Sequence, residues 1–216
     1  MRIIMKQGLS IIVGLMLCSV SVFAADAKRG EALSSECVAC HGADGNSAVA
    51  NFPKIAGQNA KYILKQFDDM TKTPAEGGRE IPEMTAIMAK FSTQDKADLA
   101  AFFASQTMTP AAADPELAAL GEKLYRGGNH AKGMAACSGC HGPDAKGNKG
   151  AAYPALAGQH ADYIAKQLKA FRQGADQPLK AGSRVNDGDA KTMRSIAEKM
   201  SDLEIDALAS FISGLR

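Results

Sequence analysis

The chain contains a long internal repeat, which constrains the fold more than any other feature of the sequence. Five segments recur in the same order in its two halves. The matched pairs are 30–33 with 121–124, 37–41 with 137–141, 51–58 with 152–159, 62–67 with 163–168, and 84–102 with 193–211. The sequence therefore predicts two homologous domains, residues 25–108 and 116–216, joined by a linker of residues 109–115 that contains two prolines.

Helical signals dominate both halves. Ser92 and Ser201 each precede a segment with apolar residues at helical spacing, and Glu204 completes a capping box with Ser201. Residues 59–70 and 160–171 are further predicted helices, and no stretch alternates between polar and apolar residues as a strand does. We therefore expect an all-α fold of two tandem helical domains, each of about one hundred residues.

Each half carries a Cys-x-x-Cys-His motif, the attachment signature of c-type haem. The motif residues are Cys37, Cys40, His41, Cys137, Cys140 and His141. Residues three and four apart share one face of a helix, so both thiols can bond to the haem edge while the histidine reaches the iron from the same side. A four-cysteine zinc site is the alternative, but zinc requires neither a histidine after each pair nor a domain around each pair. The sequence predicts two covalently bound haem c groups, each buried in its own domain.

The repeat selects two of the ten methionines as candidates for the second axial ligand. Met84 and Met193 align, and each stands eight residues before the serine that caps the last helix of its half. Met88 and Met200 have no methionine counterpart, so we expect them to pack in the core, the usual fate of methionine. Core packing is the alternative for Met84 and Met193 as well, but their preserved register favours iron ligation.

The remaining histidines and two prolines bear on the same sites. His130 lies in a segment found only in the second half, and His160 aligns with an asparagine, so both are expected to be surface or capping residues. Pro53 and Pro154 follow the two motifs at almost the same distance. A carbonyl near each proline could accept the second ring N–H of the motif histidine and raise its basicity; a plain turn into the next helix is the alternative.

Residues 1–24 have the pattern of a secretory signal peptide, with two basic residues, an apolar stretch, and small residues before a cleavage point after Ala24. An uncleaved anchor is the alternative, because residues 7–25 carry no charge. Cleavage leaves 23 basic and 23 acidic residues, a balance that excludes a nucleic-acid-binding protein. The four cysteines that remain all belong to the two motifs, so none is left to form a disulfide.

With these residues the chain resembles the cytochrome c4 family of periplasmic di-haem cytochromes. The resemblance covers nearly all of the chain after residue 24. It rests on both Cys-x-x-Cys-His motifs, FPKIAGQ at 52–58, YPALAGQH at 153–160, Met84, Met193 and the Asn-Asp-Gly-Asp stretch at 186–189. It implies class I-type domains related by an approximate twofold axis, histidine–methionine ligation of both irons, and haems packed edge to edge.

The resemblance also implies a function and partners. Members carry electrons in the periplasm toward a terminal oxidase, often with loose membrane association. The implied partners are redox proteins such as a bc-type quinol–cytochrome c oxidoreductase and a terminal oxidase, with no nucleic acid and no small-molecule substrate.

With both axial positions filled by the protein, neither iron has an open position for a substrate, which favours an electron carrier over an enzyme. One alternative is the cytochrome subunit of a larger dehydrogenase, for which the haem chemistry would be identical. Another is a di-haem peroxidase or a thiosulfate-oxidising cytochrome, which needs a labile iron position or a cysteine ligand. The matched methionines and the lack of a spare cysteine argue against this second alternative.

Overall fold

The structure, a computed structural model, describes residues 24–216, so the predicted signal peptide lies outside the described residues apart from Ala24. Within this range the chain forms helices and two isolated β-bridges but no strand. The N-terminal half contains α1 (Ala27–Leu33), η1 (Ser34–Cys37), α2 (Val38–His41), α3 (Ala60–Asp69), η2 (Pro74–Glu76), α4 (Pro82–Met88) and α5 (Thr93–Ser105). The C-terminal half contains α6 (Pro115–Gly127), η3 (His130–Lys132), α7 (Ser138–His141), α8 (Ala161–Gly174), α9 (Thr192–Ala197) and α10 (Asp202–Gly214). None of these helices combines the length and the apolar character needed to cross a membrane.

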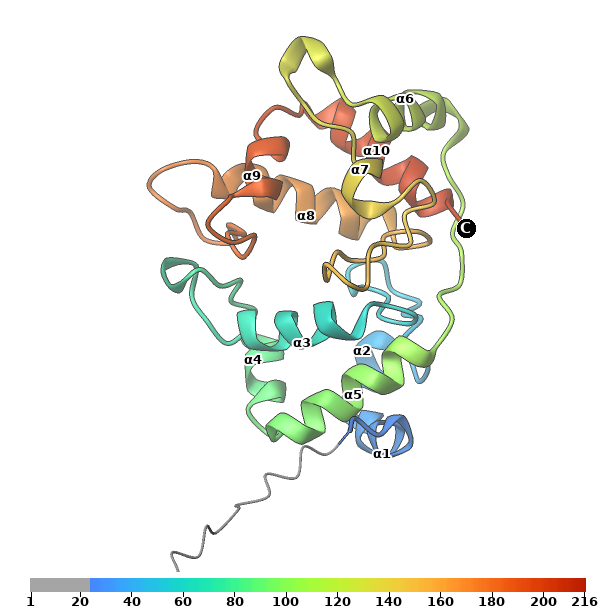
Figure 1. Cartoon of the computed structure of the whole chain (residues 1–216), viewed down its shortest axis with the longest axis vertical. Coiled ribbons are helices and arrows are strands. Elements are labelled where there is room, and N and C mark those ends of the chain that lie inside the picture. Colours follow the sequence, from blue (N-terminus) through green and yellow to red (C-terminus); the bar gives the residue numbers. More distant parts are fainter. Residues whose placement is uncertain (1–23) are drawn as a thin grey trace, which may run out of the picture.

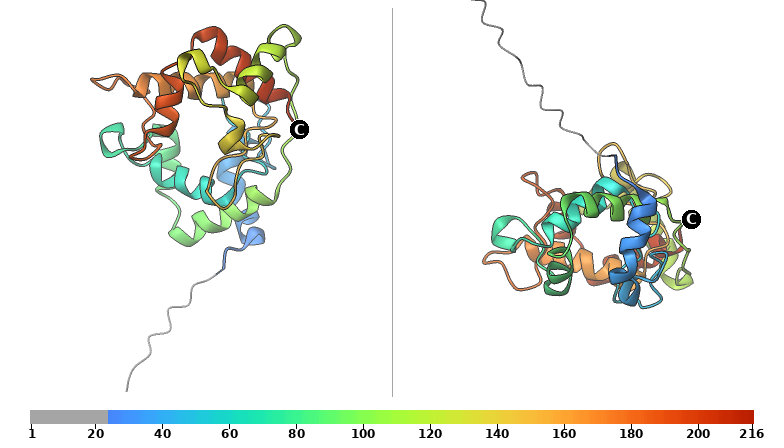
Figure 2. Two further views of the ribbon diagram at one scale, coloured as in Figure 1. Left: turned by 45° about the horizontal axis from the view of Figure 1, so that its top comes forward. Right: turned by 90° about the horizontal axis from the view of Figure 1, so that it is seen from below.

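The two halves repeat one arrangement of helices. In chain order, α1 to α5 correspond to α6 to α10, and the two halves are stacked along the long axis of the molecule (Figure 1). The connecting segment 106–114 runs along one side, and in the view from below the C-terminal half lies behind the N-terminal half (Figure 2, right). The predicted all-α fold is confirmed.

A glycine lets the first and last helices of each half pack closely. A Cβ atom added at Gly30 of α1 would lie 2.0 Å from the Asp98 carbonyl oxygen of α5. At Gly121 of α6 it would lie 2.1 Å from the Ala207 carbonyl oxygen of α10. Only glycine leaves room for such an approach of backbone to backbone, which explains why this residue recurs at the start of each repeat.

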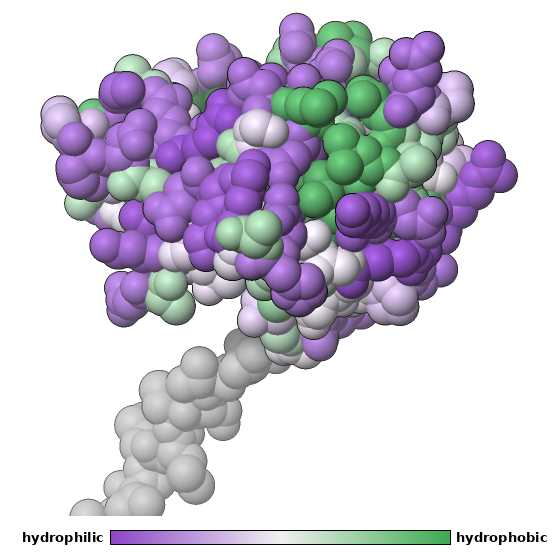
Figure 3. All heavy atoms as spheres, turned by 90° about the horizontal axis from the view of Figure 1, so that it is seen from above, coloured by the Kyte–Doolittle hydropathy of each residue, from purple (hydrophilic) through white to green (hydrophobic). Residues whose placement is uncertain are grey.

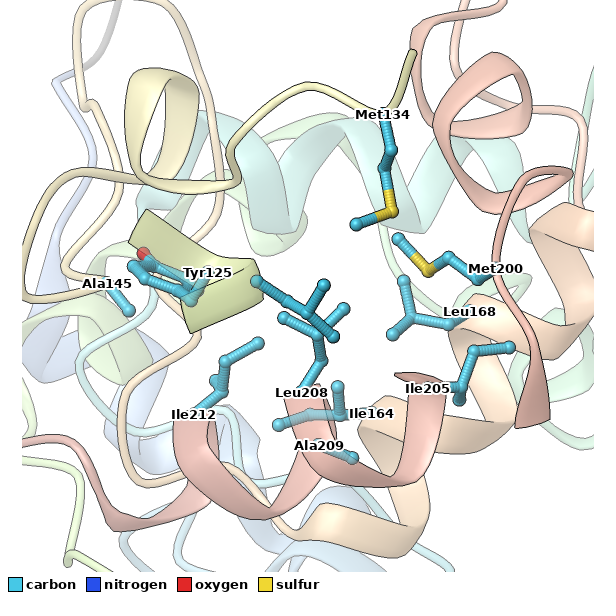
Figure 4. Packing of buried hydrophobic residues seen from close by; sticks show 11 residues of the cluster. Tyr125, Met134, Ala145, Ile164, Leu168, Met200, Ile205, Leu208, Ala209 and Ile212 are labelled. Atoms are coloured by element: carbon cyan, nitrogen blue, oxygen red, sulfur yellow. The ribbon is translucent and has the colours of Figure 1, made fainter. Parts of the chain in front are cut away.

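Each half buries its own apolar cluster, and the two clusters share no residue. In the C-terminal half, side chains from α6, α8 and α10 point into one interior, with Tyr125 toward one end and Met134 and Met200 toward the other (Figure 4). The Tyr125 hydroxyl donates to the Gly142 carbonyl oxygen at 2.6 Å. This bond ties α6 to the residue that ends α7, the helical turn of the second haem motif.

Both predicted serine caps are present as complete capping boxes. At the start of α5, the Ser92 hydroxyl accepts from the Asp95 N–H and the Asp95 carboxylate accepts from the Ser92 N–H. Ser201 and Glu204 make the same pair of bonds at the start of α10. Glu204 also accepts hydrogen bonds from Asn129 at 2.9 Å and Lys132 at 2.6 Å. The loop found only in the second half is thus anchored on the capping carboxylate of the last helix.

The ionisation of Glu204 makes this anchor sensitive to pH. Burial tends to raise the pKa of Glu204, but hydrogen bonds from Lys132, the Ser201 N–H and Asn129 outweigh burial and lower the pKa to about 2. A carboxylate with a lowered pKa stabilises the fold above its unfolded-state pKa, here near 4.5, and loses that contribution as the pH falls toward 2. Charge-assisted hydrogen bonds of this kind contribute about 2 kcal/mol.

We therefore expect Glu204→Gln to lower the free energy of unfolding at pH 7 by about 2 kcal/mol and to have little effect near pH 2. Denaturant unfolding of the holoprotein at both pH values measures the difference. Glu198 is an exposed glutamate at the end of α9, six residues before Glu204. Glu198→Gln is therefore the matched control and should change neither free energy of unfolding. An equal loss of stability at both pH values would show that the charge of Glu204 plays no part.

Candidate haem sites

Each haem motif lies on a single helical turn. The first cysteine of each motif directly precedes α2 or α7, and the second cysteine and the histidine lie three and four residues later within that helix, so the three side chains project from one face. Gly42 and Gly142 end these turns with φ values of 79° and 82°, in the region that favours glycine. The required turn explains the glycine after each histidine. The four motif cysteines form no disulfide with one another.

The motif histidines are buried and oriented by a backbone carbonyl. His41 Nδ1 lies 2.8 Å from the Pro53 oxygen, and His141 Nδ1 lies 3.1 Å from the Pro154 oxygen. A carbonyl can only accept, so each ring carries its proton on Nδ1 and has a lone pair on Nε2. The predicted carbonyl partners at both prolines are therefore confirmed.

The environment keeps both rings neutral, the form that binds iron. Burial lowers the pKa of His41 and of His141, and the carbonyl hydrogen bond opposes this only in part. Burial disfavours the charged form of the thiols as well, and therefore raises the pKa of Cys37 and of Cys137 to about 11. Among residues 24–216, no three His, Cys, Asp or Glu side chains gather as a metal cluster, and the two cysteine pairs lie in different halves.

Each candidate methionine packs against the apolar cluster that the first motif cysteine of its own half also contacts. Met84 of α4 packs against the N-terminal cluster, which includes Cys37, and Met193 of α9 packs against the C-terminal cluster, as does Cys137. Both side chains are half-buried, so each borders the interior without being enclosed by it. Their role as iron ligands stays a prediction.

Met88 and Met200 are core residues, as expected, and Met134 is buried with them. Met88 is 0% exposed, Met134 2% and Met200 4%. These three side chains fill the clusters around the motifs. In the C-terminal half, Met134 and Met200 approach each other within the interior (Figure 4).

The remaining histidines differ from each other. His130 is exposed in η3, as predicted. His160 stands at the capping position of α8, but its side chain makes no capping hydrogen bond. Its Nε2 instead lies 2.8 Å from the Ser47 carbonyl oxygen in the other half. The prediction of a surface or capping role for His160 was wrong, because a contact between halves cannot be seen from the position of a residue within its own repeat.

A half-exposed aromatic ring lies beside each motif histidine. The centroids of His41 and Phe52 are 6.5 Å apart, and those of His141 and Tyr153 are 6.4 Å apart. Phe52 is 39% exposed and Tyr153 42%. These rings occupy matched positions of the repeat, so each motif histidine has an exposed aromatic neighbour.

A buried polar cluster between the halves was not predicted from sequence. Arg79 donates to Gln66 and Gln167 at 2.9 Å each, and Arg184 donates to Tyr62 at 2.9 Å and Gln66 at 3.1 Å. Arg79 and Arg184 are each 6% exposed. The glutamines and tyrosines recur in the repeat, but the arginines lie in loops of unequal length, so no alignment pairs them.

The charge of this cluster fits the carboxylate groups that a haem carries. The acceptors of the two guanidinium groups are neutral amides and phenols, and the nearby carboxylate is that of Asp69, which Asn186 contacts at 2.7 Å. Burial and the neighbouring Arg79 both lower the pKa of Arg184. Positive charge held in the interior needs a negative partner, and haem propionates would supply it.

Comparisons with known proteins find cytochromes c in both halves of the chain. The family model described as cytochrome c matches residues 27–107 and 118–216, one match for each half. Cytochrome c4 of Azotobacter vinelandii is 50% identical over 97% of this chain and 99% of its own length. The crystal structure of reduced recombinant cytochrome c4 from Pseudomonas stutzeri has a TM-score of 0.82 at 48% identity, and the match covers 89% of this chain and all of that one.

One further relative has a different name. The thiosulfate dehydrogenase electron acceptor of Stutzerimonas stutzeri is 34% identical over 94% of this chain and 92% of its own length. Cytochromes of this kind carry haem c covalently and transfer electrons, and two domain matches correspond to two haems. The chain therefore belongs to the cytochrome c4 family of di-haem electron carriers.

Proposed function

We propose that the protein is a periplasmic electron shuttle of a respiratory chain. It takes electrons from a bc-type quinol–cytochrome c oxidoreductase and delivers them toward a terminal oxidase. Residues 25–108 and 116–216 form the two carrier domains, exported with cleavage after Ala24. The separate apolar cluster in each half supports this division.

The residue roles follow the repeat. Cys37 and Cys40 attach one haem and Cys137 and Cys140 the other, while His41 with Met84 and His141 with Met193 hold the two irons. The observation that carries the proposal is the same buried, carbonyl-bonded histidine in both halves. Histidine and methionine together would raise the reduction potential of the haem they hold. With both residues bound to the iron, the protein's own side chains would leave no position for a substrate.

The surface offers places where a redox partner can dock. Phe52 and Tyr153 are half-exposed beside the two histidines. At the end formed by the C-terminal half, a mostly polar surface contains one apolar area (Figure 3). An apolar area with a polar rim is typical of a protein-docking surface.

Reoxidation by a terminal oxidase tests the proposal. The purified holoprotein, chemically reduced, is mixed with respiratory membranes of its source organism, and loss of the reduced haem bands is followed together with oxygen uptake. We expect rapid reoxidation that cyanide blocks. Reduced protein that stays reduced beside an active oxidase would contradict the respiratory role.

The name of the thiosulfate dehydrogenase electron acceptor favours one alternative, in which the protein accepts electrons from a dehydrogenase. In that case the oxidised protein should be reduced by thiosulfate together with a thiosulfate dehydrogenase, and should co-purify with the enzyme at a stoichiometric ratio. Reduction by a quinol and the bc-type enzyme at a much higher rate would favour the respiratory shuttle instead.

A further inference from the structure

Residues 42–59 of the N-terminal half and 142–160 of the C-terminal half meet between the stacked halves (Figures 1 and 2). At the first haem site, the Pro53 carbonyl oxygen accepts from His41 Nδ1 within the N-terminal half. The N–H of the same peptide group belongs to Lys54 and donates to Gln159 Oε1 of the other half at 2.9 Å. A single peptide group therefore joins the first motif histidine to a glutamine of the second half.

The second site repeats this contact in the opposite direction. The Pro154 oxygen accepts from His141 Nδ1, and the following N–H, of Ala155, donates to Gln58 Oε1 at 2.9 Å. Each half thus supplies a glutamine that holds the histidine-bearing peptide group of the other half. Both glutamines follow the glycine of the matched Gly-Gln pair, and the repeat alone gives no sign that they act across the halves.

Both glutamine side chains are held in one orientation. The Gln159 amide donates from Nε2 to the Lys54 carbonyl at 2.7 Å, and Gln58 donates to the Ala155 carbonyl at 2.8 Å. Each amide therefore closes two bonds on one residue of the opposite half. Gln58 is 6% exposed and Gln159 5%. Reversing either amide would place donor against donor, so the oxygen must face the N–H.

We propose that Gln58 and Gln159 are positioning residues that set the basicity of the motif histidine in the opposite half, Gln159 for His41 and Gln58 for His141. When a peptide N–H donates, its carbonyl becomes a stronger acceptor, because hydrogen bonds in a chain polarise one another. A stronger carbonyl draws the Nδ1 proton and makes the imidazole a better donor to iron. Each glutamine therefore favours the ferric state in the half to which it does not belong.

The inference rests on the proposed histidine ligation, and it predicts a crossed pattern. Gln159→Met should raise the midpoint potential of the haem bound at His41, with an increase of roughly threefold in its ferrous-to-ferric ratio at the original midpoint. Gln58→Met should do the same for the haem bound at His141. A glutamine that merely stabilised its own half would instead change the midpoint potential of the haem in that half.

The experiment uses the full-length holoprotein labelled with ¹⁵N-histidine. In the reduced, diamagnetic state the Nδ1–H signals of His41 and His141 are assigned through contacts with Phe52 and Tyr153, and the two potentials are measured by titration. Gln159→Met should move the His41 proton signal toward a weaker hydrogen bond and leave His141 unchanged. Gln173→Met is the matched control in the same half, since its amide contacts only the Ala181 carbonyl, at 3.3 Å, and it should change neither signal.

Movement of both signals together, movement of the signal in the same half, or no movement in a folded variant would each overturn the inference. Gln159→Glu provides a second test if the methionine variant does not fold, because glutamate keeps the acceptor oxygen and loses the donor. It should strengthen the His41 hydrogen bond and lower the potential of that haem. Failure of the respiratory role would leave these shifts intact, whereas failure of histidine ligation would leave both potentials unchanged even though the Nδ1–H signals moved.

Discussion

Cys137→Ala combined with Cys140→Ala is expected to leave one covalently bound haem per chain in place of two. The two thiols project from one face of the α7 turn together with His141, and no other described cysteine lies in the C-terminal half. Because a haem fills much of the interior of such a small helical domain, we also expect the C-terminal half to lose helix. Haem counted per denatured chain, together with circular dichroism, measures both effects.

Gly139→Ala is the matched control for this variant, since it lies between the same two cysteines and a Cβ atom there would meet nothing within 4 Å. It should retain two haems. The reciprocal pair, Cys37→Ala with Cys40→Ala, should leave the C-terminal haem in place. Retention of two covalent haems in either double variant would contradict the assignment of these cysteines.

Met193→Ala is expected to abolish methionine ligation at one haem and leave the other unchanged. The charge-transfer band between methionine sulfur and ferric iron should fall to about half, and the potential of the affected haem should drop, because axial ligands set haem potentials over about 0.8 V. Met84→Ala should have the same effect on the other haem. Optical redox titration of each holoprotein measures the band and the potentials together.

Met200→Ala separates ligation from packing. Met200 is 4% exposed in the same cluster that Met193 borders, so its removal should lower the free energy of unfolding by about 2–5 kcal/mol while the band persists. Met88→Ala is the equivalent control in the N-terminal half. Loss of the band in the Met200 variant, with Met193 intact, would show that the repeat selected the wrong methionine.

Local signals made much of this fold predictable. Ser201 and Glu204 mark the start of α10 because a capping box lies within four residues, and the glycine after each motif histidine marks a turn for the same reason. The carbonyl beside Pro53 was predictable only because the repeat places a proline at almost the same distance in both halves. The roles of Met84 and Met193 were selected by register alone and stay predictions.

Contacts between the halves were not predictable. His160 was expected to cap or to lie at the surface, yet its ring contacts Ser47 of the other half. Arg79 and Arg184 lie in loops of different length, so the repeat does not align them, although both join one buried cluster. Such contacts depend on how two folded units stack, and periodicity, caps and motifs describe only the residues within each unit.

The central claim is that both irons are held by histidine and methionine and are closed to substrate. Optical redox titration of the periplasmically matured protein, with haem counted per chain, tests it most directly. We predict two haems per chain, both with the methionine–iron charge-transfer band and high potentials, and no spectral change on addition of peroxide. One haem without the band, binding peroxide or another small ligand, would contradict the account and indicate an enzyme.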